Sequence, residues 1–406
     1  GDWTGTPELA YTFQWRRCDA SGDACTDIPG ATGATYDLTP DDVGATLRVA
    51  VTATNAGGDA TAESDPTPTV GPAGPANTGD PSISGTATDG ETLTADDGAW
   101  TGTPTITVTR QWRRCDASGD ACTDIPGATG ATYDLTPDDI GSRLRVVVTA
   151  TNAAGPVDAT SAPSAVVGAI PPVNDVTPAI TGTVTDGETL TAGTGTWSGS
   201  PTITYAFQWR RCDAAGDACA DIQDATGATY DAVSGDIGHA LRVVVTATNA
   251  GGSETAVSDP TVAVGAIPPT PGTPAITGTP REGLTLTSDP GTWTGSPTIG
   301  FARQWLRCDA AGANCADIPG ATGATYDLTA DDVGGTIRVR VTGSNDGGEE
   351  SATSEATAVV VAAPSAPVAG TPPGVTGTPR EEQTLTAADG TWTGSGPITL
   401  ARQWQR

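Results

Sequence analysis

The 406-residue chain has no lysine, no methionine, a single histidine, and aromatic side chains at only 5% of its positions. One histidine cannot serve a catalytic centre in every copy of a repeated unit, which argues against Ser-His-Asp and Cys-His chemistry. No apolar run approaches the ~20 residues of a membrane-spanning helix. The sequence therefore predicts a protein that is not an enzyme and that inserts no part of these residues into a membrane.

Positive charge is also scarce. All 19 basic residues are arginine, against 48 acidic residues, and the formal net charge is −29. A chain this acidic repels nucleic acid, so we predict no nucleic-acid partner. Without lysine, the lysine–asparagine isopeptide bonds that stiffen some bacterial adhesin domains cannot form. The 53 glycines and 32 prolines favour short strands and turns, and no helix is predicted.

What the chain does contain is a long repeat. The segment QWRRCDASGDACTDIPGATGATYDLTPDDVG returns three times with few changes and begins a fifth time near the end. The tryptophans of these copies stand 97, 97, 96 and 99 residues apart, at Trp15, Trp112, Trp209, Trp305 and Trp404. This period predicts one small domain per copy, at residues 1–71, 75–169, 172–266, 270–363 and 366–406, of which the first and last are partial. Since the chain opens and stops inside a copy, we expect it to be a window of a longer array, with any targeting or anchoring segment outside it.

Seven short strands are predicted in the second copy from period-two alternation and turn residues. They are expected at residues 82–88, 91–95, 105–115, 123–125, 132–135, 143–152 and 159–167. The clearest is LRVVVTATN, where Leu144, Val146 and Val148 fall on one face. Seven strands at this spacing predict an all-β fold with two packed sheets.

The eight cysteines form four pairs, each with six residues between the partners. An even count, one pair per copy and a fixed spacing predict four local disulfides in an oxidising compartment, and a zinc site is the weaker alternative because no histidine accompanies them. The pairs are Cys18 with Cys25, Cys115 with Cys122, Cys212 with Cys219, and Cys308 with Cys315.

A strand with a tryptophan, followed by a D-x-G turn into a strand that ends in asparagine, resembles an immunoglobulin-like domain. The whole unit, GxWTGTP…QWxRCDAxGxxCxDIxGATxATYDLTxxDVGxxLRVxVTATNxxG, resembles the tandem immunoglobulin-like modules of large surface and secreted proteins of high-GC bacteria. The resemblance implies immunoglobulin-like β-sandwiches in tandem. It also places the core of each domain around Trp15, Trp112, Trp209 and Trp305. Antibody domains bridge their sheets with two cysteines, whereas here the cysteines lie in a loop and the core is expected to be held by packing alone.

The linkers between copies are rich in proline, for example VGAIPPVNDVTP from Val167. Such segments favour extended polyproline II and act as semi-rigid spacers, which predicts an elongated rod. We further expect neighbouring domains or chains to hold one another in a filament.

Acidic residues gather in turns, as in Asp138 with Asp139, where they are expected to serve turn chemistry and not catalysis. The only histidine, His239, is replaced by alanine, serine or glycine in the other copies and is expected to be an ordinary turn residue. No cofactor is predicted. Calcium remains a weak alternative in the loop DASGDACTD, through Asp19, Asp23 and Asp27, although the fourth copy reads DAAGANCAD.

A second tryptophan in each copy, within a W-T/S-G turn, has two interpretations. The favoured one is packing on the open end of the sandwich or on the adjacent domain, with its N–H bonded to a carbonyl. The alternative is an exposed ring that stacks on a glycan or another surface ligand. The residues concerned are Trp3, Trp100, Trp197 and Trp293.

These observations predict a secreted or cell-surface structural protein, a fibre of stacked domains that provides reach, stiffness and adhesion. Two alternatives stay open: a carbohydrate- or receptor-binding adhesin, and a spacer array attached to an enzyme or virion protein outside this window. The copies differ diffusely along their length and not in one exposed set of loops, which favours the structural interpretation.

Overall fold

A computed structural model describes residues 1–6 and 8–405. Its regular elements are β-strands and four three-residue 3₁₀ helices. In the described residues no helix is long and apolar enough to cross a membrane. The chain divides into two compact units, one formed by Gly1–Val176, Gly195–Ala206 and Thr246–Ala256 and the other by Thr177–Thr194, Phe207–Val245 and Val257–Arg406.

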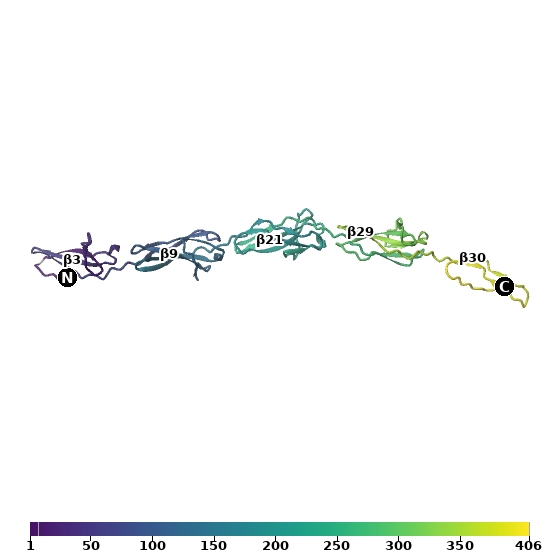
Figure 1. The fold of residues 1–406 in the computed structure, drawn as a ribbon, viewed down its shortest axis with the longest axis horizontal. Helices are drawn as coiled ribbons and strands as arrows, with labels where there is room; N and C mark the ends of the chain where they lie inside the picture. Colours follow the sequence, from purple (N-terminus) through teal and green to yellow (C-terminus); the bar gives the residue numbers. More distant parts are fainter. Residues whose placement is uncertain (7, 406) are drawn as a thin grey trace. The chain divides into compact units, whose positions relative to one another are not determined.

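Repeat 2 (residues 75–169) shows the complete architecture, and β9 marks it in Figure 1. Its larger sheet has the order β10-β9-β12-β13, all antiparallel, and its smaller sheet has the order β11-β7-β6. A short pair, β5 with β8, completes the repeat. The bounds are β5 Ala76–Gly79, β6 Ser82–Ser84, β7 Thr92–Asp96, β8 Ala99–Thr101, β9 Thr107–Cys115, β10 Thr123–Asp124, β11 Thr132–Asp134, η2 Pro137–Asp139, β12 Arg143–Asn152 and β13 Gly155–Thr160.

Repeats 3 and 4 have the same strand orders in both sheets. Repeat 3 contains β14 Val173–Val176, β15 Ile180–Thr181, β16 Thr189–Ala192, β17 Thr196–Ser198, β18 Thr204–Arg211, β19 Ala220–Asp221, β20 Thr229–Asp231, η3 Ser234–Asp236, β21 Leu241–Asn249 and β22 Gly252–Val257. Repeat 4 contains β23 Ala275–Thr277, β24 Thr285–Asp289, β25 Gly300–Cys308, β26 Ala316–Asp317, β27 Thr325–Asp327, η4 Ala330–Asp332, β28 Thr336–Asn345 and β29 Gly348–Thr353.

The core of repeat 2 lies between its two sheets. Trp112 of β9 is fully buried and packs with Leu93 of β7 and with Val146 and Val148 of β12. The alternation predicted for LRVVVTATN is therefore the alternation of core and outer face along β12. The indole N–H of Trp112 donates to the carbonyl of Gly130 at 3.0 Å, which satisfies the one polar atom that the ring brings into the core.

The structure of repeat 2 differs from the prediction in strand bounds and in elements that were not predicted; for example, the predicted strand 82–88 ends at Ser84. The last strand is β13 at Gly155–Thr160, and not 159–167, because Asn152 and Gly155 close a tight turn that starts the strand earlier. Beyond it, Ser161 and Ser164 still donate single backbone hydrogen bonds to β12, and Val167 donates one to Ser142 just before β12, but Pro163 cannot take part in a ladder. The strand pair β5 and β8 was not predicted, and neither were the 3₁₀ helices, which are too short to show a periodicity.

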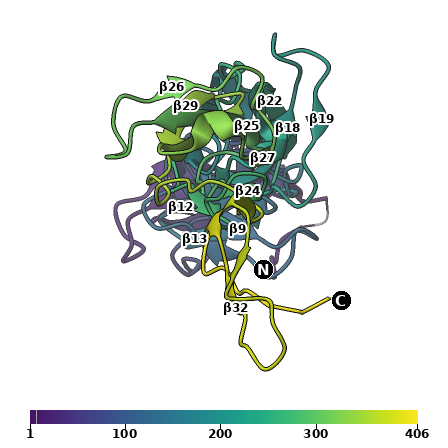
Figure 2. The same ribbon diagram turned by 90° about the vertical axis from the view of Figure 1, so that its right-hand side faces the viewer.

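The first and last repeats contain only one part of this architecture. Repeat 1 has the larger sheet alone, formed by β1 Ala10–Cys18, β2 Thr26–Asp27, β3 Thr46–Asn55 and β4 Gly58–Glu63, with η1 at Pro40–Asp42. Repeat 5, drawn in yellow in Figure 2, has the pairs β30 Val368–Thr371 with β33 Thr391–Thr393 and β31 Gly374–Thr376 with β32 Thr386–Ala388. Its Trp404 is 60% exposed, whereas its counterparts Trp209 and Trp305 in the complete repeats are fully buried.

Candidate functional site

A fully buried aspartate that accepts several side-chain and backbone hydrogen bonds recurs in repeats 1 to 4. In repeat 2 this is Asp139, which is fully buried at the end of η2. One carboxylate oxygen accepts from Arg114 Nε at 2.7 Å, and the other accepts from the Tyr133 hydroxyl at 3.0 Å. The second oxygen also accepts from the backbone N–H and the hydroxyl of Thr136, at 2.8 and 2.9 Å. We call this group of four residues the aspartate knot.

The aspartate knot is present in all four repeats that contain this part of the fold. Its carboxylates pair with arginine at 2.6 to 2.7 Å, as Asp42 with Arg17, Asp139 with Arg114, Asp236 with Arg211 and Asp332 with Arg307. The sequence analysis treated Asp138 and Asp139 as equivalent turn residues, but only Asp139 is buried, and repeat 1 likewise buries Asp42 and exposes Asp41. The available signal was that repeat 3 replaces the first of the pair by Gly235 and retains the second.

The electrostatics of the aspartate knot are those of a structural ion pair. Burial on its own raises the pKa of Asp332, but hydrogen bonds from the Thr329 backbone, Arg307 and Tyr326 outweigh burial and leave the pKa below its ordinary value. Burial, reinforced by the hydrogen bond to Asp236, raises the pKa of Tyr230 to about 12. The carboxylate accepts four hydrogen bonds in repeat 2 and three in repeat 3, where Val233 has no hydroxyl. The aspartate knot therefore fixes η2 and its counterparts against the sheet.

The four predicted cysteine pairs are joined as disulfides in the structure. In repeat 2 the bridge connects the end of β9 to the residue before β10, so it closes the loop between two neighbouring strands. Within that loop, Asp116 Oδ1 accepts from the backbone N–H groups of Ser118 and Asp120 at 3.0 and 2.9 Å. The pKa of Asp116 is lowered mainly by the hydrogen bond from the Ser118 hydroxyl and secondly by the bond from the Asp120 backbone N–H.

The same loop was the calcium alternative. The carboxylate of Asp19 is bonded by Ser21 and by the backbone of Asp23, and Asp27 pairs with Arg16 at 2.9 Å. In the described part of the chain no three His, Cys, Asp or Glu side chains gather in a way that could hold a metal. When the loop of repeat 4 is aligned with that of repeat 1, Ala313 occupies the position of Asp23, and Asn314 occupies the next position.

The second tryptophan of repeat 2 lies half-buried against the core. The indole N–H of Trp100 donates to the carbonyl of Asp97 at 2.9 Å, and the Asp97 carboxylate pairs with Arg110 of β9. Trp293 in repeat 4 makes the corresponding bond to Pro290 at 2.8 Å and lies 5.6 Å from the ring of Phe301. Trp3 and Trp197 lie 6.2 and 6.4 Å from the rings of Tyr11 and Tyr205. These contacts occupy the ring edges of Trp100 and Trp293 inside their own repeats.

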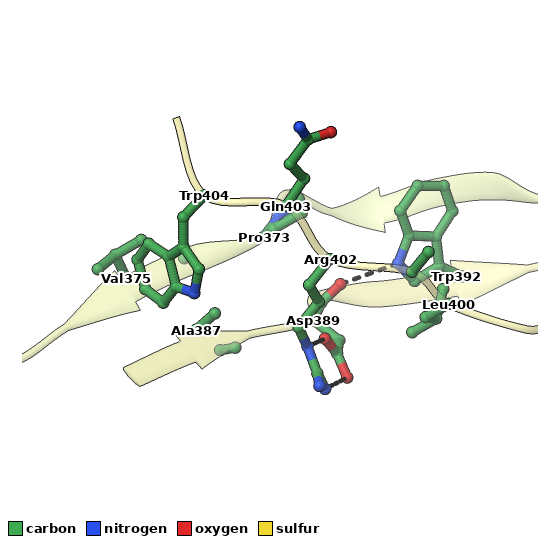
Figure 3. Close-up of a pocket in the computed structure, with 12 residues that line it drawn as sticks. Pro373, Val375, Ala387, Asp389, Trp392, Leu400, Arg402, Gln403 and Trp404 are labelled. Carbon is green, nitrogen blue, oxygen red and sulfur yellow. Dashed lines mark hydrogen bonds and ion pairs between the residues drawn. The ribbon is translucent and has the colours of Figure 1, made fainter. Parts of the chain in front are cut away.

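A hollow of about 270 Å³ in repeat 5 is lined partly by Val375, Ala387 and Trp404, whose counterparts in repeat 2 belong to the core, and partly by polar residues such as Asp389 and Arg402. Figure 3 shows Trp404 facing Val375 and Ala387, with Trp392 and Arg402 both bonded to Asp389. In repeat 2 the equivalent Trp112 is covered by β7 and β12, and the structure describes no strand equivalent to β12 among residues 366–405. Trp15 of repeat 1 is only partly buried for the corresponding reason.

His239 makes one contact that the sequence did not indicate. Its Nδ1 lies 2.9 Å from the carbonyl oxygen of Cys212, while the side chain is exposed on the turn before β21. No second catalytic group accompanies this contact in the hydrogen bonds of the described residues, and the position is alanine, serine or glycine in the other repeats.

A more specific site lies where repeat 2 meets repeat 3, entirely inside the first compact unit. The turn between β6 and β7 carries Asp89, whose side chain accepts from the hydroxyl of Ser200 at 2.6 Å. Ser200 accepts from the backbone N–H of Ile170 in the linker at 2.8 Å, and Asn249 Nδ2 donates to the Ile170 carbonyl at 2.8 Å. Asp89 is 7% exposed and Ser200 is 1% exposed. We call this arrangement the joint.

The joint is repeated inside the second compact unit, where repeat 3 meets repeat 4. Ser296 donates to Asp186 at 2.6 Å and accepts from Ile267 N–H at 2.8 Å, and Asn345 Nδ2 donates to the Ile267 carbonyl at 2.8 Å. Where repeat 1 meets repeat 2, Thr103 takes the place of the serine and accepts from the Ala73 N–H at 2.8 Å. Sequence analysis missed the joint because its members are about 110 residues apart and look like ordinary turn residues.

Two sheets of fixed strand order around a buried tryptophan, repeated along the chain, define tandem immunoglobulin-like β-sandwich domains, each with one local disulfide. The sequence matches no family model and no curated protein. Among solved structures, the N-terminal four immunoglobulin domains of Dscam1 isoform 6.9 are 15% identical, with 87% of this chain and 92% of that chain covered and a TM-score of 0.24. A structure of domains from titin is 18% identical, with 71% and 99% covered and a TM-score of 0.24.

Proposed function

We propose that the chain is an extracellular structural repeat protein whose neighbouring domains are connected through the joints and which serves as a fibre or filament at a cell surface. The observation that carries the proposal is the joint itself. Two independent joints use the same three side chains with the same 2.6 Å bond from a buried serine to a buried aspartate. A linker that only had to connect domains would not need such bonds.

Burial makes these bonds strong determinants of geometry. A buried carboxylate that loses its hydrogen-bond donor is destabilising, because no other bond offsets its desolvation. A bend that separates Asp89 from Ser200 therefore raises the free energy of the chain. Asn249 and Ser200 also bind both the carbonyl and the N–H of Ile170, which fixes the linker backbone. The four disulfides support an oxidising compartment and hence a location outside the cytoplasm.

The test compares the chain with a Ser200→Ala, Ser296→Ala double variant by negative-stain electron microscopy, with the angle between neighbouring domains measured on single particles. The native chain is expected to give narrow angle distributions at these two junctions and, at high concentration, ordered fibres with an axial repeat. The double variant is expected to give broad distributions with each domain still folded.

The matched control is Ser198→Ala, which removes an exposed hydroxyl whose 3.2 Å bond to Asp175 lies outside the joint. Native particles as freely bent as those of the double variant would overturn the structural proposal. Such a result would direct the search towards a ligand of the adhesin type.

A further inference from the structure

A shallow groove of about 530 Å³ lies on the surface of repeat 4, entirely inside the second compact unit. It lies between residues 318–324, the loop that joins β26 to β27, and the residues next to η4. Its volume is within the range of sites that bind small molecules. The groups that line it include Pro319, Thr325, Asp327, Thr329, Asp331 and the guanidinium of Arg307.

The same surface is open in repeat 2. Repeat 2 exposes the equivalent residues Asp134, Thr136 and Asp138, although repeat 3, which follows it, has both of its sheets. The groove is therefore a feature of the single domain.

The lining of the groove is the same in three repeats. Repeats 2 and 4 differ at seven of the 31 positions of residues 111–141 and 304–334, and none of the eleven lining residues is among the seven. Repeat 1 has the same eleven residues. Repeat 3 changes four of them, to Gln223, Asp224, Val233 and Gly235. The chain thus contains an intact lining and an altered one for comparison.

Two carboxylates of the lining are available to a ligand. Oδ1 of Asp327 accepts from the Thr285 hydroxyl at 2.6 Å, which orients the carboxylate and leaves Oδ2 for an outside donor. Asp331 is exposed, and no other group among residues 1–6 and 8–405 is bonded to its carboxylate. Arg307, by contrast, is paired with Asp332. The aspartate knot therefore explains why the arginine is retained, but it does not explain why Asp331 is retained.

A guanidinium lies beside these carboxylates. In repeat 3, a Cβ built on Gly235, which stands in the place of Asp331, would lie 3.6 Å from a terminal nitrogen of Arg211. The Arg307 side chain is 34% exposed, and its Nε donates to Asp332 at 2.7 Å. Its exposed part can donate to a ligand while the aspartate knot stays intact. The groove therefore offers several acceptors and one charged donor.

A neutral sugar matches this set of groups. Its hydroxyls donate to carboxylates and accept from a guanidinium, and its C–H groups pack on an apolar ring such as that of Pro319. The two carboxylates repel an anion, and the guanidinium repels a cation. We propose that this groove, in repeats 2 and 4, binds a neutral oligosaccharide. This activity goes beyond the proposed fibre and does not depend on it.

The test measures binding of the 406-residue chain to an array of immobilised neutral, anionic and cationic oligosaccharides. The chain has no lysine and no free cysteine, so a fluorescent label can be placed on its N-terminal amine alone. We expect retention on neutral oligosaccharides with an apparent dissociation constant on the order of 100 μM, since more than one groove engages the surface.

The decisive variant removes the unbonded acid from every repeat that has it, as Asp41→Gly, Asp138→Gly and Asp331→Gly together. Repeat 3 already has glycine there, so the fold is expected to stay intact and binding to fall by at least about 10-fold. The matched control is Asp23→Ala, Asp120→Ala and Asp217→Ala together, which changes the charge equally in the disulfide loop, where repeat 4 already has Ala313. The control is expected to bind as the native chain does.

A gain of binding is the complementary test. Repeat 3 acquires the lining of repeats 2 and 4 through Gln223→Pro, Asp224→Gly, Val233→Thr and Gly235→Asp, and retention is expected to rise about 3-fold. Circular dichroism checks that each variant is folded. Absence of binding to neutral oligosaccharides, binding to charged ones alone, or an equal loss in the two triple variants would each overturn the proposal.

Discussion

Repeats 2 and 3 hold the same buried aspartate with different sets of donors. Asp139 in repeat 2 accepts four hydrogen bonds, one of them from the hydroxyl of Thr136. Asp236 in repeat 3 keeps the bonds from arginine, tyrosine and the backbone, but the capping residue is Val233 and has no hydroxyl to donate. Both aspartates are fully buried. The arginine, the tyrosine and the backbone N–H are thus sufficient for the fold, and the threonine is an addition.

The largest effect is expected from removal of the carboxylate in either repeat. Asp139→Ala and Asp236→Ala each leave an arginine and a tyrosine hydroxyl without their partner, which costs about 3 kcal/mol. Hydrogen exchange measured by mass spectrometry should show protection lost in β12 or β21 by about 100-fold, and only in the altered repeat. If the loss of protection differs widely between the two variants, the donors that both repeats share do not account for the stability that the aspartate provides.

The second-largest effect is expected at alkaline pH, which should weaken the aspartate knot of repeat 3. The folded-state pKa of Tyr230, about 12, lies above the ordinary value of 10.0, so the contribution of its phenol to stability is complete below pH 10. That contribution is lost as the pH rises through 12, because the ionised phenol faces Asp236. Tryptophan fluorescence should report unfolding in this window, and Tyr230→Phe should remove the corresponding phenolate absorbance. A Tyr230 that titrates at pH 10 would contradict this prediction.

Swapping the capping residues of repeats 2 and 3 should change their stabilities by a smaller amount and in opposite directions. Thr136→Val removes one hydrogen bond from Asp139 and is expected to destabilise repeat 2 by about 1 kcal/mol. Val233→Thr supplies the missing bond to Asp236 and is expected to stabilise repeat 3 by a similar amount. Exchange protection in β12 and β21 measures both changes. Two changes of the same sign would mean that the hydroxyl is not the cause.

The smallest effect concerns a loop position at which repeats 2 and 3 agree. Ala121 and Ala218 have φ values of +46° and +49°, and repeat 4 has asparagine there, Asn314, at +52°. Asparagine tolerates this left-handed region better than alanine. Ala121→Asn and Ala218→Asn should therefore each stabilise their repeat by roughly 0.5 kcal/mol, measured as a rise in thermal midpoint. A loss in both would show that local backbone strain does not limit this loop.

Sequence patterns were informative wherever structure is local or periodic. Alternation located β12 because Val146 and Val148 face one core, and the regular spacing indicated how the cysteines pair. The patterns were uninformative where a polar residue acts over a long distance. Asp139 is bonded to Arg114, 25 residues away, and Asp89 to Ser200, 111 residues away, so no short stretch of sequence contains both partners.

The way arginine is placed in repeat 2 affects how proteases act on it. Its five arginines all lie in the paired strands β9 and β12, at Arg110, Arg113, Arg114, Arg143 and Arg145. The chain has no lysine, so the peptide bonds after these arginines are the only ones in repeat 2 that a trypsin-like enzyme recognises. Each of these arginines lies in a strand that is hydrogen-bonded to its neighbour. Cleavage there requires the repeat to open, so digestion by such an enzyme counts opening events and leaves the folded repeat whole.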